Sequence, residues 1–282
     1  MLAISQVREV AQGLDHSEGV TTGPDGTLYA GGWHGQVYAI DPGTGVVEQI
    51  GHVDGVVLGL AVDAEGAVYL CDVINRLVVV VRRGEPNQVY SRSAGGREYT
   101  IPNYLAFDDD GSLWLTDSGE EDPENPGGRI VRIPPGGGDA EVMSPENLPF
   151  PNGICVGPQG QIYFVDSFGH GVSELVDGVV RPIARLEGVT PDGIAAEADG
   201  GILVSCYYPF RILRADSQTG EVTTLLDDTV GTTLRMPTNI SHFGQELASL
   251  AITNFAGHKL LAVDPGVAGV PLRYPTVRGP QQ

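Results

Sequence analysis

The chain has 282 residues, including 40 glycines and 20 prolines, and a formal net charge of −20. This charge argues against nucleic acid and anionic membranes as partners, because phosphate groups repel an acidic surface. The sequence contains no run of about 18 apolar residues, so we expect no membrane span. The first residues lack the features of a secretory signal. Cys71, Cys155 and Cys206 are widely spaced inside apolar segments, so we expect buried free thiols and a cytoplasmic location.

A repeat that combines a strand opening with a glycine turn runs through the chain. In five copies the opening residue is followed eight positions later by a glycine, and the pairs are Glu18 and Gly26, Leu58 and Gly66, Asn103 and Gly111, Asn152 and Gly160, and Asp192 and Gly200. A sixth copy opens at Thr238-Asn239 and lacks this glycine. The openings are about 40 to 49 residues apart, which is the length of one four-stranded propeller blade.

Each copy reads as four short strands. In the first copy these are residues 18–22, 27–30, 36–41 and 45–50, with an Asp-Gly turn between the first two. The last copy ends near residue 264 without a convincing fourth strand, and residues 6–11 could supply it and close the ring. The sequence therefore predicts one all-β domain over residues 1–282, a six-bladed β-propeller with four antiparallel strands per blade.

Four of the six openings carry oxygen side chains, namely Glu18, Asn103, Asn152 and Asp192. The first strand of each blade lines the channel of a propeller, so these four residues should converge at one mouth. Asparagine and aspartate also occur at ordinary turns, but glutamate is a poor turn residue, and two carboxylates near one axis repel each other unless something neutralises them. The pattern indicates a site for a hard cation such as calcium or magnesium. Without cysteine or histidine at these positions, zinc is disfavoured but remains open.

These residues and their neighbours resemble the senescence marker protein, gluconolactonase and luciferin-regenerating enzyme family. The resemblance covers essentially the whole chain, and it is most specific in Glu18-Gly19, Pro151-Asn152-Gly153 and Pro191-Asp192-Gly193. It implies that Glu18, Asn152 and Asp192 bind a divalent cation, often calcium. It further implies that Asn103 contacts the metal or the substrate, and that Asp192 also acts as general base or nucleophile. The family includes sugar lactonases and organophosphate hydrolases.

Some positions depart from the family's pattern. Ile101 stands where several sugar lactonases have an arginine, and Tyr104 stands where many have an aspartate. Losing the arginine removes a planar cationic donor suited to an oxygen-rich substrate. We therefore expect a substrate less polar than gluconolactone.

The loops that follow the second strands should surround the same mouth. His34, His170 and His258 lie in such loops, and each is a candidate general base or simply a solvated loop residue. His34 is our first choice, and His16 is a candidate neighbour of the metal site because it lies two residues before Glu18. The predicted catalytic residues are Asp192, Asn103 and His34.

Aromatic side chains are also frequent near this mouth. They either line an apolar substrate pocket or pack between blades. Our candidates for the pocket are Trp33, Tyr104, Phe168 and Tyr207.

Three functions fit this constellation. The predicted one is hydrolysis of a small-molecule lactone or related ester, with the metal as a Lewis acid. The alternative is an isomerase, cyclase or lyase in which the same centre stabilises an oxyanion. The third is a non-enzymatic propeller that binds a ligand or a protein, which would not need convergent carboxylates. We expect calcium, with magnesium, manganese and zinc as alternatives, a small-molecule substrate, and a monomer or small homo-oligomer.

Overall fold

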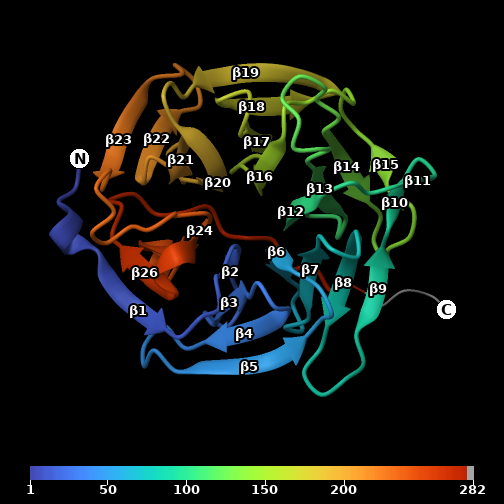
Figure 1. Ribbon diagram of the computed structural model, residues 1–282, viewed down its shortest axis with the longest axis horizontal. Helices are drawn as coiled ribbons and strands as arrows, with labels where there is room; N and C mark the ends of the chain where they lie inside the picture. The colour runs from blue at the N-terminus through green and yellow to red at the C-terminus, as the bar shows by residue number, and fades with distance from the viewer. Residues whose placement is uncertain (278–282) are drawn as a thin grey trace.

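The computed structural model describes residues 1–277, whose strands form six four-stranded antiparallel sheets arranged around a centre (Figure 1). This confirms the predicted six-bladed β-propeller. Blade one contains β2 (Val20–Thr22), β3 (Leu28–Gly31), β4 (Gln36–Ile40) and β5 (Val47–His52). Blade two contains β6 (Val57–Val62), β7 (Val68–Asp72), β8 (Leu77–Val81) and β9 (Gln88–Ser91). Blade three contains β12 (Pro102–Phe107), β13 (Leu113–Asp117), β14 (Arg129–Ile133) and β15 (Glu141–Val142).

The remaining blades follow the same order from the centre outward. Blade four contains β16 (Pro151–Val156), β17 (Ile162–Asp166), β18 (Gly171–Val176) and β19 (Val179–Arg185). Blade five contains β20 (Thr190–Ala196), β21 (Gly201–Tyr208), β22 (Arg211–Asp216) and β23 (Val222–Asp227). Blade six contains β24 (Ile240–Phe243), β25 (Ser249–Asn254), β26 (Lys259–Val263) and β1 (Arg8–Gln12). A hairpin of β10 (Ser93–Ala94) and β11 (Arg97–Glu98) and the 3₁₀ turns η1 (Ile4–Gln6), η2 (Gln245–Leu247) and η3 (Phe255–Gly257) complete the assigned elements.

The N-terminal strand closes the ring, as the sequence predicts. β1 pairs antiparallel with β26, from Arg8 opposite Ala262 to Gln12 opposite Lys259. An ion pair between Lys259 Nζ and Glu9 Oε2 at 2.6 Å spans the same two strands. Closure gives the last blade its fourth strand and leaves no outer edge of β26 unpaired.

The repeated glycines form the turns between first and second strands. All five have positive φ, between +81° for Gly66 and +95° for Gly200, a region that side chains with a Cβ rarely adopt. Blade six reaches the same result differently. Gly244 (φ +79°) is followed directly by η2, so a 3₁₀ turn replaces the Asp-Gly turn.

Segment 264–277 crosses the end of the channel opposite the strand openings, and Figure 1 shows it passing across the centre of the ring. Val270 N donates to Ala196 O at 3.0 Å, and Tyr274 Oη donates to Thr22 O at 2.9 Å. A cavity of about 70 Å³ lies between this segment and the first strands, with walls that include Leu60. The mouth at the strand openings is therefore the one that offers access to the channel.

The three cysteines are free and buried, as predicted. Within residues 1–277, no helix is long and apolar enough to cross a membrane.

Candidate functional site

The predicted metal ligands lie where the first strands begin, and irregular strand pairing helps to place three of them. The register between first and second strands shifts between Pro102 and Leu105, between Pro151 and Ile154, and between Pro191 and Ile194. Asn103, Asn152 and Asp192 each lie inside such a shift, where a strand locally bends and can re-aim a side chain. Glu18 comes two residues before β2. The six first strands pack against one another around the channel, which brings these openings to one mouth.

Two serines set the orientation of the asparagine amides. Ser118 Oγ donates to Pro151 O at 2.7 Å and accepts from Asn103 Nδ2 at 3.0 Å. Ser167 Oγ donates to Pro191 O at 2.7 Å and accepts from Asn152 Nδ2 at 3.2 Å. Because a hydroxyl has one proton and the carbonyl takes it, each amide must present its nitrogen to the serine. The amide oxygens are thereby left available as ligands.

Glu18 and Asp192 are two carboxylates that repel each other when both are charged. Burial raises the pKa of Glu18 to about 7. Burial, followed by the negative charge of Glu18, raises the pKa of Asp192 well above its ordinary range, and a contact with the Asn152 amide only partly offsets this. Among residues 1–277, no cationic side chain contributes to either shift. Two carboxylates in this situation are charged together only if something positive lies between them.

The residues at this mouth fit a divalent cation. Asn152 Oδ1 and Asp192 Oδ1 are shielded from solvent and have no hydrogen-bond partner within the described part of the chain. A buried acceptor without a partner costs about 1–3 kcal/mol. A bound cation would satisfy both oxygens and neutralise the two carboxylates. With Glu18 and Asn103, the donor set consists entirely of oxygen, which suits calcium and magnesium.

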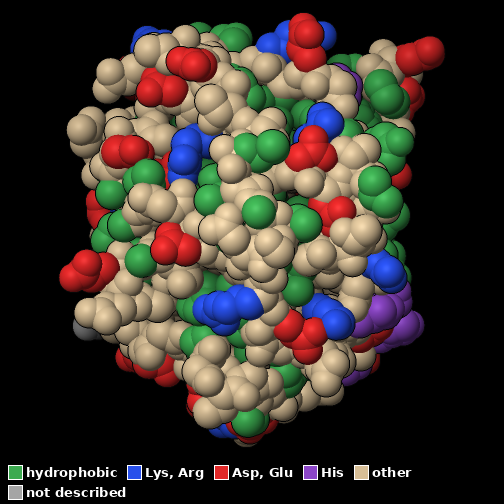
Figure 2. All heavy atoms as spheres, turned by 90° about the vertical axis from the view of Figure 1, so that its left-hand side faces the viewer, with side chains coloured by type: hydrophobic (Ala, Val, Ile, Leu, Met, Phe, Trp, Pro, Cys, Tyr) green, Lys and Arg blue, Asp and Glu red, His purple; other side chains and the backbone are tan. Residues whose placement is uncertain are grey.

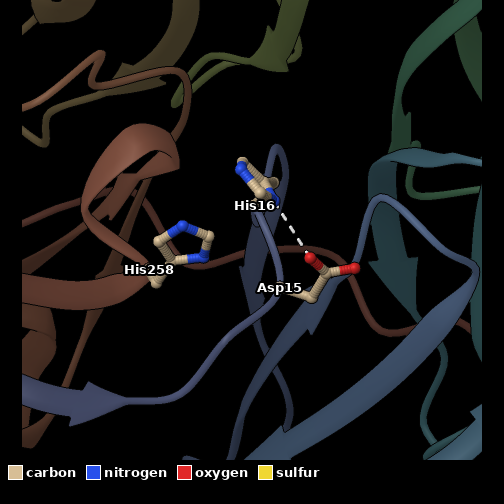
Figure 3. A group of neighbouring side chains, drawn as sticks. All are labelled: Asp15, His16 and His258. Carbon is tan, nitrogen blue, oxygen red and sulfur yellow. Dashed lines mark hydrogen bonds and ion pairs between the residues drawn. The ribbon is translucent and has the colours of Figure 1, made fainter.

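His34 forms a pair with Asp15. His34 Nδ1 lies 2.6 Å from Asp15 Oδ2, which also accepts from the His34 backbone N–H at 3.2 Å. The other oxygen, Asp15 Oδ1, lies 2.9 Å from His16 Nδ1 (Figure 3). Burial favours the protonated form of Asp15, but hydrogen bonds from His16 and His34 outweigh it and lower the pKa to about 2. Since an ionised carboxylate only accepts, the proton of His34 sits on Nδ1, and Nε2 is free to take another.

The structure brings His16 and His258 together and places His170 elsewhere. The rings of His16 and His258 are 4.1 Å apart, edge to face. His170 lies in blade four, where its Nδ1 donates to Val189 O at 2.7 Å. Of the three candidate loop histidines, His34 and His258 therefore flank the Asp15–His16 pair, and His170 does not.

Two of the aromatic pocket candidates lie in loops with aromatic neighbours. Trp33 is 44% exposed and meets Phe255 edge to face at 5.4 Å. Phe168 is half-buried against Phe150, with ring centroids 4.9 Å apart. Both rings keep an accessible face. Their contact with a substrate stays a prediction.

The two tyrosine candidates lie in different surroundings. Tyr207 is partly exposed, and burial, then the charges of Glu18 and Asp192, raise its pKa, so it lies near both carboxylates. Tyr104 is buried, and its hydroxyl donates to Val20 O of blade one at 2.9 Å. This bond gives Tyr104 a role in joining blades three and one. Its contact with substrate remains untested.

Sequence reasoning missed Ser118, Ser167 and Asp15. Each serine follows its asparagine by 15 positions and ends an Asp-Ser pair, so the repeat held a signal for both. Asp15 has no counterpart in the other repeats. Its partner His16 is the next residue, but His34 comes from a separate loop, and no local spacing connects the two.

A six-bladed propeller with a cluster of oxygen side chains at one channel mouth defines the class of this protein. The chain belongs to the SMP-30/gluconolactonase/LRE-like family, whose model matches residues 16–256. No curated protein matches the chain in sequence.

Solved structures share the fold at low sequence identity. A gluconolactonase from Xanthomonas campestris is 22% identical, with a TM-score of 0.75 and coverage of 93% of this chain and 89% of the other. A luciferin-regenerating enzyme is 17% identical, with a TM-score of 0.76 and coverage of 95% and 99%. Regucalcin from Agrobacterium tumefaciens, described as a calcium-binding protein, is 16% identical, with a TM-score of 0.75 and coverage of 96% and 98%.

Proposed function

We propose that the chain is a divalent-metal-dependent hydrolase that opens a small-molecule lactone or a related ester. Family membership supports the class of reaction, together with the gluconolactonase among the similar structures. The observation that carries the metal is the pair of mutually repelling carboxylates of half-buried Glu18 and buried Asp192. Calcium is the proposed ion, because every ligand is an oxygen and a calcium-binding protein shares the fold.

In this proposal Glu18, Asn103, Asn152 and Asp192 hold the cation. When bound, a divalent cation supplies a Lewis acid that polarises the substrate carbonyl and stabilises the charge that develops on its oxygen. Ser118 and Ser167 keep the amide oxygens of the two asparagines aimed at it.

Proton transfer falls to His34, with Asp192 as the other candidate. Nε2 of His34 takes a proton from the attacking water, and Asp15 Oδ2 stabilises the imidazolium that results. As the acyl carbon–oxygen bond breaks, the same proton passes to the leaving alkoxide oxygen. The products are an alcohol and a carboxylic acid that releases its proton to solvent to become the carboxylate, and in a lactone the two groups remain on one molecule.

Aromatic side chains shape the substrate preference. Tyr207 lies near the carboxylates, and Trp33 and Phe168 occupy loops beyond the second strands. With Ile101 where several sugar lactonases have arginine, these rings favour a substrate less polar than gluconolactone.

The setting of the enzyme follows from its chemistry. Three buried free thiols suit a reducing cytoplasm, and a net charge of −20 favours small molecules over nucleic acid or anionic membranes as partners. A closed propeller carries its complete channel within one chain, so a monomer or small homo-oligomer suffices.

The test is turnover of a panel of lactones and aryl esters before and after chelation, and again after calcium is restored, in water labelled with ¹⁸O. We expect activity that needs the metal and one labelled oxygen in the acid product. Asp192→Ala should abolish turnover, whereas Asp54→Ala, at an exposed loop position, should not. Turnover without label would show rearrangement or elimination, and full activity in Asp192→Ala would remove Asp192 from the mechanism.

A further inference from the structure

A second group of metal-ligating side chains lies at the same end of the propeller, outside the oxygen cluster. Asp15, His16 and His258 each offer one ligand atom, and these atoms lie within 4.8 Å of one another. The loop before β2 supplies Asp15 and His16, and the loop between β25 and β26 supplies His258 (Figure 3). In Figure 2 a group of histidine side chains gathers at the surface near one edge of the molecule. Because His258 is exposed and Asp15 and His16 are half-buried, the cluster joins blades one and six on an accessible face.

The surrounding bonds prepare the ligand atoms. His258 Nδ1 lies 3.2 Å from Leu14 O, and because a carbonyl only accepts, Nδ1 carries the proton and Nε2 is left free. Histidines that bind metals usually donate their other N–H in this way. Asp15 is held similarly, since its Oδ2 accepts from the side chain and backbone of His34 while Oδ1 faces His16. One oxygen of Asp15 is thus fixed by His34, and the other faces into the cluster, where it accepts a hydrogen bond from His16 Nδ1 that ligation of both groups would replace.

The backbone holds both histidines in an unfavourable conformation. His16 has φ +41° and His258 has φ +54°, in the region where a residue with a Cβ is strained. Asparagine or glycine would adopt these conformations more easily. The chain nevertheless has an imidazole at both positions, and the two rings lie 4.1 Å apart.

We propose that Asp15, His16 and His258 bind a second divalent cation of the zinc type, separate from the cation of the oxygen cluster. Two imidazoles and one carboxylate, with a fourth position open to water or another ligand, form a donor set that zinc prefers. The oxygen cluster at Glu18 and Asp192 suits calcium instead. Zinc–ligand bonds of about 2.0–2.1 Å in a tetrahedron put ligand atoms about 3.3 Å apart. Because the ligand atoms already lie within 4.8 Å of one another, no pair has to draw together by more than about 1.5 Å. Rotation of surface side chains can provide this movement. The proposal does not depend on the hydrolytic reaction.

The experiment is a calorimetric titration of the full-length protein with Zn²⁺ in excess Ca²⁺. We expect one zinc equivalent to bind to the wild-type protein. His16→Asn and His258→Asn should each weaken this binding at least about 100-fold, because each removes a direct ligand. Asparagine is chosen because it tolerates positive φ, so the loops should keep their shape. Glu18→Gln should leave zinc binding unchanged.

His170→Asn is the matched control. His170 also has positive φ (+52°) and also bonds a carbonyl through Nδ1, but it lies in blade four, outside the cluster. Its variant should bind zinc as the wild type does. Equal zinc affinity in wild type, His16→Asn and His258→Asn would overturn the proposal, as would zinc binding lost in Glu18→Gln and kept in His258→Asn.

A measurement on the wild-type protein avoids any effect of substitution on folding. Addition of one equivalent of Zn²⁺ in the presence of Ca²⁺ should shift the imidazole ¹⁵N resonances of His16 and His258, and leave those of His170 and His52 in place. Unchanged resonances for His16 and His258 would overturn the proposal.

Discussion

The negative charge of Glu18 raises the pKa of Asp192, although Glu18 opens blade one and Asp192 opens blade five. Closure of the ring brings the two carboxylates to the same channel mouth. Without a cation, folding must work against their repulsion and their burial. The groups that would bind the metal are therefore a source of instability in the metal-free protein.

Glu18→Gln should have opposite effects on stability and on metal binding. The substitution removes one of the two negative charges that repel each other, so the metal-free protein should gain about 1–2 kcal/mol in free energy of unfolding. It also removes a charged ligand, so the rise in melting temperature on adding calcium should disappear. Thermal unfolding with chelator and with calcium measures both effects.

The control is Glu187→Gln, at an exposed position. It should change neither the metal-free stability nor the response to calcium. If calcium raised the melting temperature of Glu18→Gln as much as that of the wild type, Glu18 would not be a ligand.

Ser118→Ala and Ser167→Ala should weaken calcium binding without removing a ligand. Each serine holds the nitrogen of an asparagine amide, so its loss leaves that amide free to rotate. Loss of such an outer partner typically reduces metal affinity about 10–100-fold. Calcium titration by calorimetry measures the change. Ser112→Ala is the control, since Ser112 is also buried and accepts from Arg132 Nε, but follows the turn at the other end of blade three. A loss of affinity equal to that of Ser112→Ala would show a general loss of stability instead.

The repeat explains why so much of the fold could be predicted. A fixed distance between a strand opening and its glycine turn places every opening at the same end of its blade, so one period gives the blade count and the position of Glu18, Asn103, Asn152 and Asp192. Because the last copy of the repeat lacked a fourth strand, the N-terminal segment that forms β1 could be predicted to supply it. The two serines that orient the asparagine amides, Ser118 and Ser167, also occur at a fixed position of the repeat, each as the second residue of an Asp-Ser pair. Only the hydrogen bond of each hydroxyl to the next blade could not be predicted from that pattern.

Contacts outside the repeat could not be predicted. Asp15, His16 and His258 meet because the ring closes between blades six and one, and nothing in the spacing of these residues records it. Tyr104 illustrates a different limit. Its position in the repeat placed an aromatic ring near the channel, but the hydrogen bond to Val20 O depends on how closely β12 and β2 approach.

Asp166 should make stability fall as pH rises. Asp117, at the same position in blade three, accepts from Thr100 N, Ile101 N and Arg129 Nε, whereas Asp166 Oδ1 has no partner among residues 1–277. Burial raises the pKa of Asp166 from 3.8 to about 7. The folded state then binds this proton more tightly than the unfolded state, so its contribution to stability is complete below about pH 4 and is lost as pH rises to about 7.

Asp166→Asn tests this assignment, because asparagine resembles the protonated acid at every pH. The variant should be more stable than the wild type by about 2–4 kcal/mol at pH 8, and the difference should vanish near pH 4. Urea unfolding in the presence of chelator measures both values, with Asp54→Asn as an exposed control. A pH-independent difference between Asp166→Asn and the wild type would contradict a raised pKa.

Gly153→Ala should disturb both the ring and the metal ligands. A Cβ at Gly153 would lie 2.7 Å from Asp192 O and 2.9 Å from Gly193 Cα, so it would push blade five away from blade four. We expect a loss of about 1–3 kcal/mol in free energy of unfolding, together with weaker calcium binding, because Asp192 moves with its backbone. Gly127→Ala is the matched control, since no other part of residues 1–277 lies within 4 Å of its Cβ position and its φ is not positive. It should be neutral or slightly stabilising. If Gly153→Ala lost stability but bound calcium as tightly as the wild type, the ligand positions would not depend on the spacing of the first strands, and the account of how the ring assembles the site would be wrong.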